Sequence, residues 1–140
     1  MPTASYTKCT AAIEPLLEGI NVGSDSWKVA LTNTDATAKT SFVAGTDDLA
    51  TGNGYTAGGT AASITSSSQS SGTYKLVLAD VTFTASGGSI GPFRYAVLYN
   101  DTATNDELIG FWDYGSSISL NNGEALTVDF DATNGVLQLV

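Results

Sequence analysis

The C-terminal part of the chain holds an alternating apolar stretch between two Asn-Gly pairs. The pairs occupy residues 122–123 and 134–135, on either side of the stretch ALTVDFD (125–131). Asn-Gly suits the positive backbone dihedrals of tight primed turns, so each pair predicts a β-hairpin. The residues expected to face inward are Leu126, Val128 and Phe130. The pattern predicts a three-stranded antiparallel meander.

Three other segments have strand character. WKVALTN (27–33) alternates in the manner of a strand with one buried face. FRYAVLYND (93–101) and LIGFWDYG (108–115) are almost continuously apolar. Continuous apolar runs of this length are typical of central strands that are covered on both faces.

The stretch TYKLVLADVTFTA (73–85) is also strand-like, but its buried face changes parity at Ala79-Asp80. A bulge or a strand break is therefore expected there. The short strands and turn signals together predict one all-β domain over residues 1–140. We expect an antiparallel β-sandwich, a jelly-roll-like fold or a related barrel, with one short N-terminal helix.

The helix is expected at residues 10–20, within an N-terminal segment of residues 1–26. Apolar residues recur there at helical spacing, while Pro15 confines the helix to a short piece and Gly19 ends it. The apolar residues are Ile13, Leu16, Leu17 and Ile20.

Less regular segments separate these elements. Residues 34–53 have no periodicity and predict a long loop, with Phe42-Val43 as its anchor to the core. Residues 55–64 predict a weak strand of small residues. SSSQSSG (66–72) is of low complexity and predicts an exposed, mobile loop.

Charge and composition bear on partners. The chain has 14 acidic and five basic residues, a net charge of −9, which argues against nucleic acid and anionic membranes as partners. Cys9 is the sole cysteine, so no internal disulfide can form. No apolar run is long enough for a membrane span and no export signal is recognisable, so we expect a soluble chain.

The residue types also bear on catalysis. The chain has no histidine, which excludes a Ser-His-Asp triad and histidine metal ligands, and one cysteine excludes thiolate zinc sites. The glycine-rich TGNGYTAGGTAAS (51–63) lacks the spacing, the lysine and the following helix of a phosphate loop. We therefore expect no enzyme, no catalytic residue and no cofactor.

Carboxylates leave one alternative open. Asp47-Asp48 and residues 101–107 could offer oxygen ligands to calcium, yet neither matches a calcium-loop pattern. We interpret both as solvated acidic loops and predict no metal site.

Five residues are candidates for packing or interface roles. Tyr55 is expected as a packing anchor, and Gly58 as a point where the backbone bends or approaches a neighbour. Arg94, amid apolar neighbours, is expected to pair with a carboxylate inside the fold or across a subunit contact. Trp112 and Tyr114 are expected in the core or an interface, with a carbohydrate groove as the alternative.

Three stretches in this order resemble a family of small virion proteins of tailed bacteriophages: GYTAGGT (54–60), residues 93–115, and the closing GEALTVDFDATNGVLQLV (123–140). The expected helix at 10–20 and WKVALTN at 27–33 precede them, as in that family. The resemblance covers nearly the whole chain, and no catalytic residue comes with it.

The resemblance implies a structural role in the virion. It favours a capsid decoration, or cement, protein that binds the outer surface of the head and stabilises it. The implied partners are the major capsid protein and copies of the chain itself, with a trimer as the favoured oligomer. The alternative is a tail-fibre or receptor-binding module that recognises a host glycan.

Overall fold

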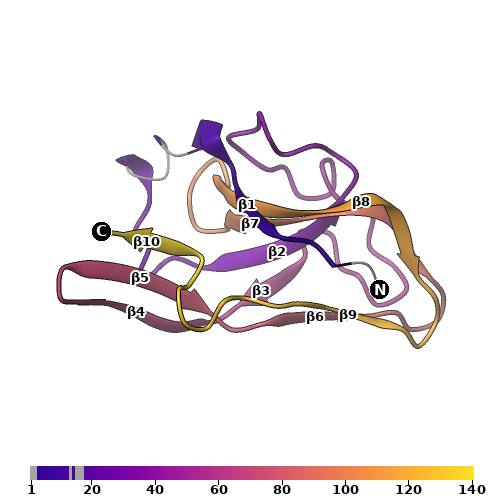
Figure 1. The fold of residues 1–140 in the computed structure, drawn as a ribbon. Helices are drawn as coiled ribbons and strands as arrows, with labels where there is room; N and C mark the ends of the chain where they lie inside the picture. Colours follow the sequence, from indigo (N-terminus) through magenta and orange to yellow (C-terminus); the bar gives the residue numbers. More distant parts are fainter. Residues whose placement is uncertain (1–2, 13, 15–17) are drawn as a thin grey trace.

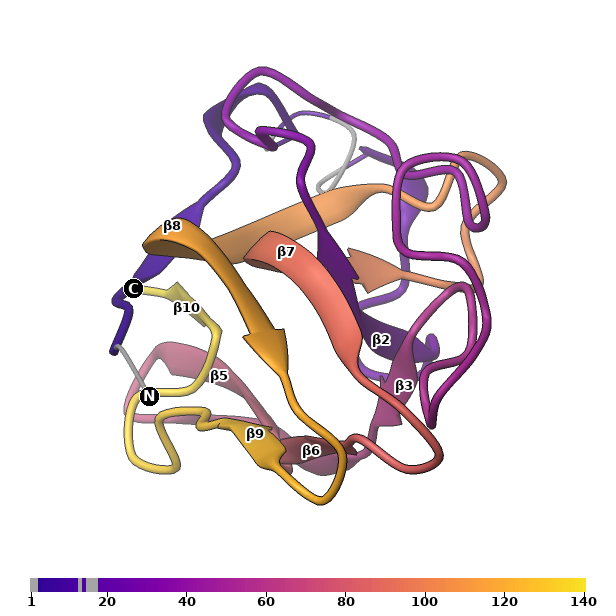
Figure 2. The same ribbon diagram turned by 90° about the vertical axis from the view of Figure 1, so that its right-hand side faces the viewer.

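Antiparallel strands stack in two layers (Figures 1 and 2). The computed structural model describes residues 3–12, 14 and 18–140. The upper layer in Figure 1 has the strand order β1-β8-β7-β2-β3, and the lower layer contains β10-β5-β4 and β6-β9. The strands are β1 (Tyr6–Lys8), β2 (Trp27–Thr32), β3 (Thr60–Ala62), β4 (Ile64–Ser70), β5 (Thr73–Leu78), β6 (Val81–Thr84), β7 (Ile90–Asn100), β8 (Leu108–Leu120), β9 (Ala125–Val128) and β10 (Leu137–Leu139). The predicted all-β antiparallel sandwich is confirmed.

The lower layer follows from the parity change at Ala79-Asp80. Strand β5 ends before Ala79-Asp80 and strand β6 begins after this pair. Because the two strands are separate, both can direct their apolar side chains into the sandwich. The Asp80 carboxylate accepts a hydrogen bond of 2.9 Å from the Phe130 N–H and joins the break to the neighbouring chain segment. The expected bulge or break is thus a strand break.

The C-terminal meander predicted from the sequence is wrong. β9 pairs with β6 rather than with β8, and β10 pairs with β5 rather than with β9. The Asn122-Gly123 turn carries the chain from the upper layer to the lower one, and the Gly123 N–H bonds to the Ala85 carbonyl oxygen at 2.8 Å. Because β9 lies in the lower layer, Leu126 and Val128 are buried between the two layers. Their predicted inward orientation is therefore confirmed although the predicted strand pairing is wrong.

The five-stranded sheet is covered on both faces. Its inner face packs against the lower layer, and its outer face lies under the N-terminal segment and the loop after β2. The second face of β2, expected to be exposed, is therefore buried, with Ala30 in the outer cluster. Phe42 anchors the loop as predicted, but Val43 is 53% exposed and does not.

The segment 66–72, predicted as a mobile loop, is instead mostly strand. β4 pairs with β5 in a hairpin that closes at Ser71-Gly72, both with positive φ. Its side chains are exposed, as expected, but Leu76 anchors β5 in the core and β5 holds β4 by backbone hydrogen bonds. The weak strand expected over 55–64 is confined to β3 and the start of β4.

The N-terminal segment contains a strand that the sequence did not predict, β1, followed by a 3-10 turn, Thr10–Ala12. The rest of the expected helix at 10–20 includes residues 13 and 15–17, which lie outside the described residues. In the described part of the chain, no helix has the length and apolar character needed to cross a bilayer.

A substitution at Gly59 tests the close contact between β2 and the loop that leads to β3. Its φ is +82°, and a Cβ there would lie 1.9 Å from the Val29 carbonyl oxygen. We expect Gly59→Ala to lower the free energy of unfolding by about 3 kcal/mol or more, measured by urea denaturation.

The matched control is Gly45→Ala. Gly45 has a similar φ of +78°, but no atom of the described residues lies within 4 Å of its Cβ position. Only the backbone conformation is then strained, at a cost of about 1 kcal/mol. Equal losses in the two variants would contradict the proposed close contact.

Candidate functional site

The loop around Asp48 is organised by that single carboxylate. Asp48 Oδ2 accepts hydrogen bonds from the Tyr55 hydroxyl and the Gly58 N–H, both at 2.6 Å. Asp48 Oδ1 accepts from the Gly45 N–H at 2.7 Å. The Tyr55 hydroxyl in turn accepts from the Leu31 N–H of β2 at 3.1 Å. One side chain therefore joins three points of the loop to the sheet.

Tyr55 and Gly58 belong to this network. Tyr55 is 2% exposed and its ring packs beside Phe83, with ring centroids 5.8 Å apart. Gly58 has a φ of +94°, and its carbonyl oxygen accepts a hydrogen bond from the buried Tyr99 hydroxyl. Both residues thus pack within the chain and are not exposed for a partner. The sequence pointed to Asp48 only as a possible calcium ligand and not as the acceptor that organises the loop, because its hydrogen-bond partners lie on separate segments.

Arg94 makes a paired contact with Asp113 on the neighbouring strand. Arg94 Nε lies 2.8 Å from Asp113 Oδ1, and its second nitrogen lies 3.0 Å from Oδ2. The Arg94 guanidinium also lies over the Tyr95 ring. Hydrogen bonding from Arg94 and from the Gly115 N–H lowers the pKa of the Asp113 carboxyl. The side chains are 41% and 37% exposed, so the expected carboxylate partner lies at the surface rather than inside the fold.

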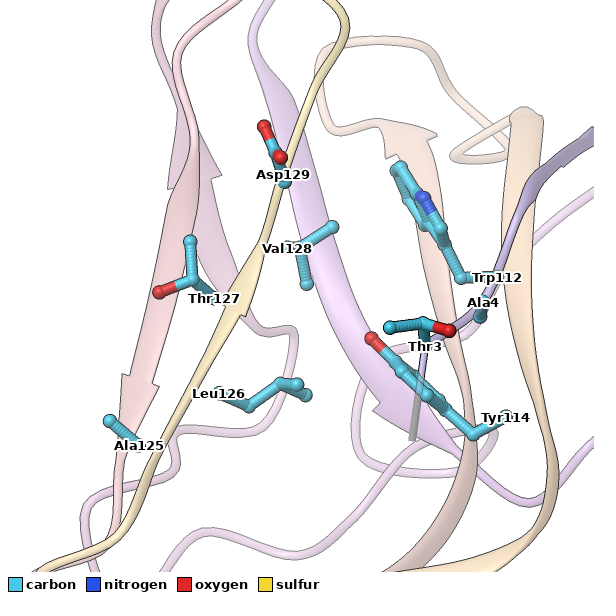
Figure 3. Close-up of a pocket in the computed structure, with 9 residues that line it drawn as sticks. All are labelled: Thr3, Ala4, Trp112, Tyr114, Ala125, Leu126, Thr127, Val128 and Asp129. Carbon is cyan, nitrogen blue, oxygen red and sulfur yellow. The ribbon is translucent and has the colours of Figure 1, made fainter. Parts of the chain in front are cut away.

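A groove of about 340 Å³ opens between β8 and β9 (Figure 3). Trp112 and Tyr114 of β8 form one wall, together with Thr3 and Ala4, and residues 125–129 form the other. Trp112 is 5% exposed and packs edge-on against Phe130, while Tyr114 is half-buried. The structure therefore brings Trp112 and Tyr114 together and separates them from the other three candidates.

Strand edges border this groove on both sides. β1 pairs with β8 only from Gly110 to Trp112, so β8 extends past the end of β1. β9 pairs with β6 along one edge, and within the described residues no strand pairs with its other edge. The sequence predicts that β8 and β9 pair as a hairpin, and paired strands would leave no groove between them. The groove was therefore not predicted from the sequence.

The groove is acidic. Asp129 is its charged lining residue, with Glu124 and Asp131 near the ends of β9, and no lysine or arginine is among the described residues that line it. Three of the five basic side chains already form ion pairs elsewhere. The pairs are Lys28–Asp101, Lys39–Asp47 and Arg94–Asp113.

The two acidic loops considered for calcium use their carboxylates within the protein. Asp47 pairs with Lys39 at 2.7 Å, and Asp101 pairs with Lys28 at 3.0 Å. Burial and the neighbouring Asp101 and Glu107 carboxylates raise the pKa of Asp106. Among the residues that the structure describes, no three His, Cys, Asp or Glu side chains are grouped to hold a metal ion.

Tyr55→Phe tests the network around Asp48. It removes the hydroxyl that accepts from Leu31 and donates to Asp48, and so leaves a buried N–H without a partner. We expect a loss of about 2 kcal/mol in the free energy of unfolding. Tyr74→Phe is the control: its hydroxyl contacts Ser67 at an exposed position, so the loss should stay below about 1 kcal/mol. A comparable loss in both variants would count against the network.

Cys9 gives a test of burial and of pH dependence. The residue Cys9 is 1% exposed, and burial raises the pKa of its thiol to about 12 from an ordinary 9.0. The folded state keeps its proton where the unfolded state ionises, so this contribution to stability is full below pH 9.0 and is lost as the pH rises toward 12.

At pH 8 we expect a thiol reagent such as Ellman's reagent to react with native protein about a hundredfold more slowly, or slower still, than in urea. Equal rates in the two conditions would show that the thiol is accessible.

Comparison with known proteins gives no assignment. No family model, no curated protein and no solved structure matches this chain.

Proposed function

We propose that this protein is a non-enzymatic structural component of a bacteriophage virion, a decoration protein that binds the outer surface of the head. The observation that carries the proposal is the groove between β8 and β9, where no described strand pairs with the outer edge of β9 and the half-buried Tyr114 lies across from that edge. A protein of this kind stabilises an assembly by binding the assembled lattice better than its free subunits.

Charge supports an outward location. The net charge of −9 disfavours contact with packaged DNA, whose phosphates attract lysine and arginine. The proposed partners are the major capsid protein and copies of the chain itself, as a trimer at lattice junctions. Contact area, rather than a reactive group, would then be the working feature of the surface.

The alternative, a tail module that recognises a host glycan, needs aromatic faces on which sugars can stack. Trp112 and Tyr55 are only 5% and 2% exposed, so neither offers a free ring face. Burial of these two rings argues against sugar stacking on them, and the half-buried Tyr114 is the aromatic side chain of the groove that a glycan could reach.

Purified protein added to expanded, DNA-free capsids of the encoding phage tests the proposal. We expect cosedimentation and a rise in the thermal transition of the capsids, since selective binding to the assembled state stabilises it. An unrelated acidic β-sandwich of similar charge is the control. Absence of binding with no thermal shift would overturn the proposal, and binding to tails or host cells instead would favour the alternative.

A further inference from the structure

We propose that the groove between β8 and β9 binds an extended, basic segment of a partner protein, which adds as a strand to the free edge of β9. The inference deepens the proposed function and rests on it for the partner's place on a particle. Three features of the molecule support the binding site itself: the groove, the outer edge of β9 and the charge of Asp129.

The backbone of β9 can accept another strand. Its four residues pair in continuous register with β6, from Ala125↔Thr84 to Val128↔Val81. Alternate N–H and C=O groups of an antiparallel strand point to its other side, and there the described residues provide no paired strand. Proteins commonly protect such edges with lysine, proline or a bulge, and β9 has none of these.

The side chains beside this edge suit an extended peptide. Leu126 and Val128 point from β9 toward the interior, and Trp112 and Tyr114 lie across the groove from them (Figure 3). A strand added to β9 would place every second side chain toward these residues. The edge of β4 has no such apolar surface, because its side chains are serine, threonine and glutamine apart from Ile64.

Charge selects the occupant. Asp129 lines the groove and makes no ion pair among the described residues. Glu124 and Asp131 flank β9 in the sequence, but their carboxylates accept local hydrogen bonds, so Asp129 is the carboxylate left for a partner. A second copy of the chain would bring a further net charge of −9 to this edge. A segment with lysine or arginine beside Asp129 is complementary, whereas like charges are repelled.

The probe is a fluorescein-labelled octapeptide in which valine and threonine alternate, with lysine at two of the outward positions. One control peptide carries N-methyl groups on alternate residues, which removes the backbone donors along the edge that would face β9 but keeps the side chains. A second control replaces each lysine by glutamate. Anisotropy should show saturable binding of the probe and binding about tenfold weaker, or weaker still, for both controls.

Hydrogen exchange locates the contact. Amides on the outer edge of β9 should exchange about tenfold more slowly with the probe bound, because strand addition engages them. Asp129→Asn should weaken binding of the lysine peptide by about two- to fivefold. Asp106→Asn is the matched control: it removes the same charge at the other end of β8, where the positive φ of 48° also accommodates asparagine, and it should leave binding unchanged.

Three results would overturn the inference: equal binding of the N-methylated peptide, equal effects of Asp129→Asn and Asp106→Asn, or no protection in β9. Displacement of the probe by soluble oligosaccharides with unprotected β9 amides would overturn it in favour of a glycan site. The peptide assay uses no particle, so its outcome is separate from the capsid assay. If the protein binds capsids but not the peptide, the proposed strand-addition site is wrong and the decoration role stands. If the protein binds the peptide but not capsids, the decoration role is wrong and the peptide site stands.

Discussion

The burial of β7 on both faces is the constraint on which the other elements depend. Phe93 and Leu98 face the lower layer, while Val97 and Tyr99 face the cover formed by the N-terminal segment and the loop after β2. A strand in this position needs a packed layer on each side, because apolar surface left in water opposes folding. The lower layer supplies one cover, and the N-terminal segment supplies the other together with the loop after β2, which has no regular secondary structure of its own.

That loop can serve as a cover because its polar groups are satisfied internally. Asp48 accepts three hydrogen bonds, from Gly45, Tyr55 and Gly58, and Tyr99 donates to the Gly58 carbonyl oxygen. Buried polar groups without partners would cost more than the loop gains by packing. The glycines provide the positive φ values and close approaches of this arrangement, rather than a cradle for phosphate.

The open side of the sandwich follows from unequal strand lengths and from the layer crossing after β8. β1 ends its pairing opposite Trp112, while β8 continues to Leu120 and then leads into the opposite layer. Apolar walls therefore lie beside a strand edge with which no strand of the described residues pairs. This combination, with the acidic Asp129 beside it, distinguishes the groove from the hydroxyl-rich face of the β4–β5 hairpin.

The sequence by itself determined the fold class, the buried central strands, the inward orientation of Leu126 and Val128, and the break at Ala79-Asp80. These properties follow from the period of side chains along one strand, which is local. Only the tertiary structure decided that β9 pairs with β6, that β4 is a strand, and that Trp112 faces a groove. Strand partners depend on where distant apolar faces meet across two layers, and the alternation within one segment carries no information about that meeting.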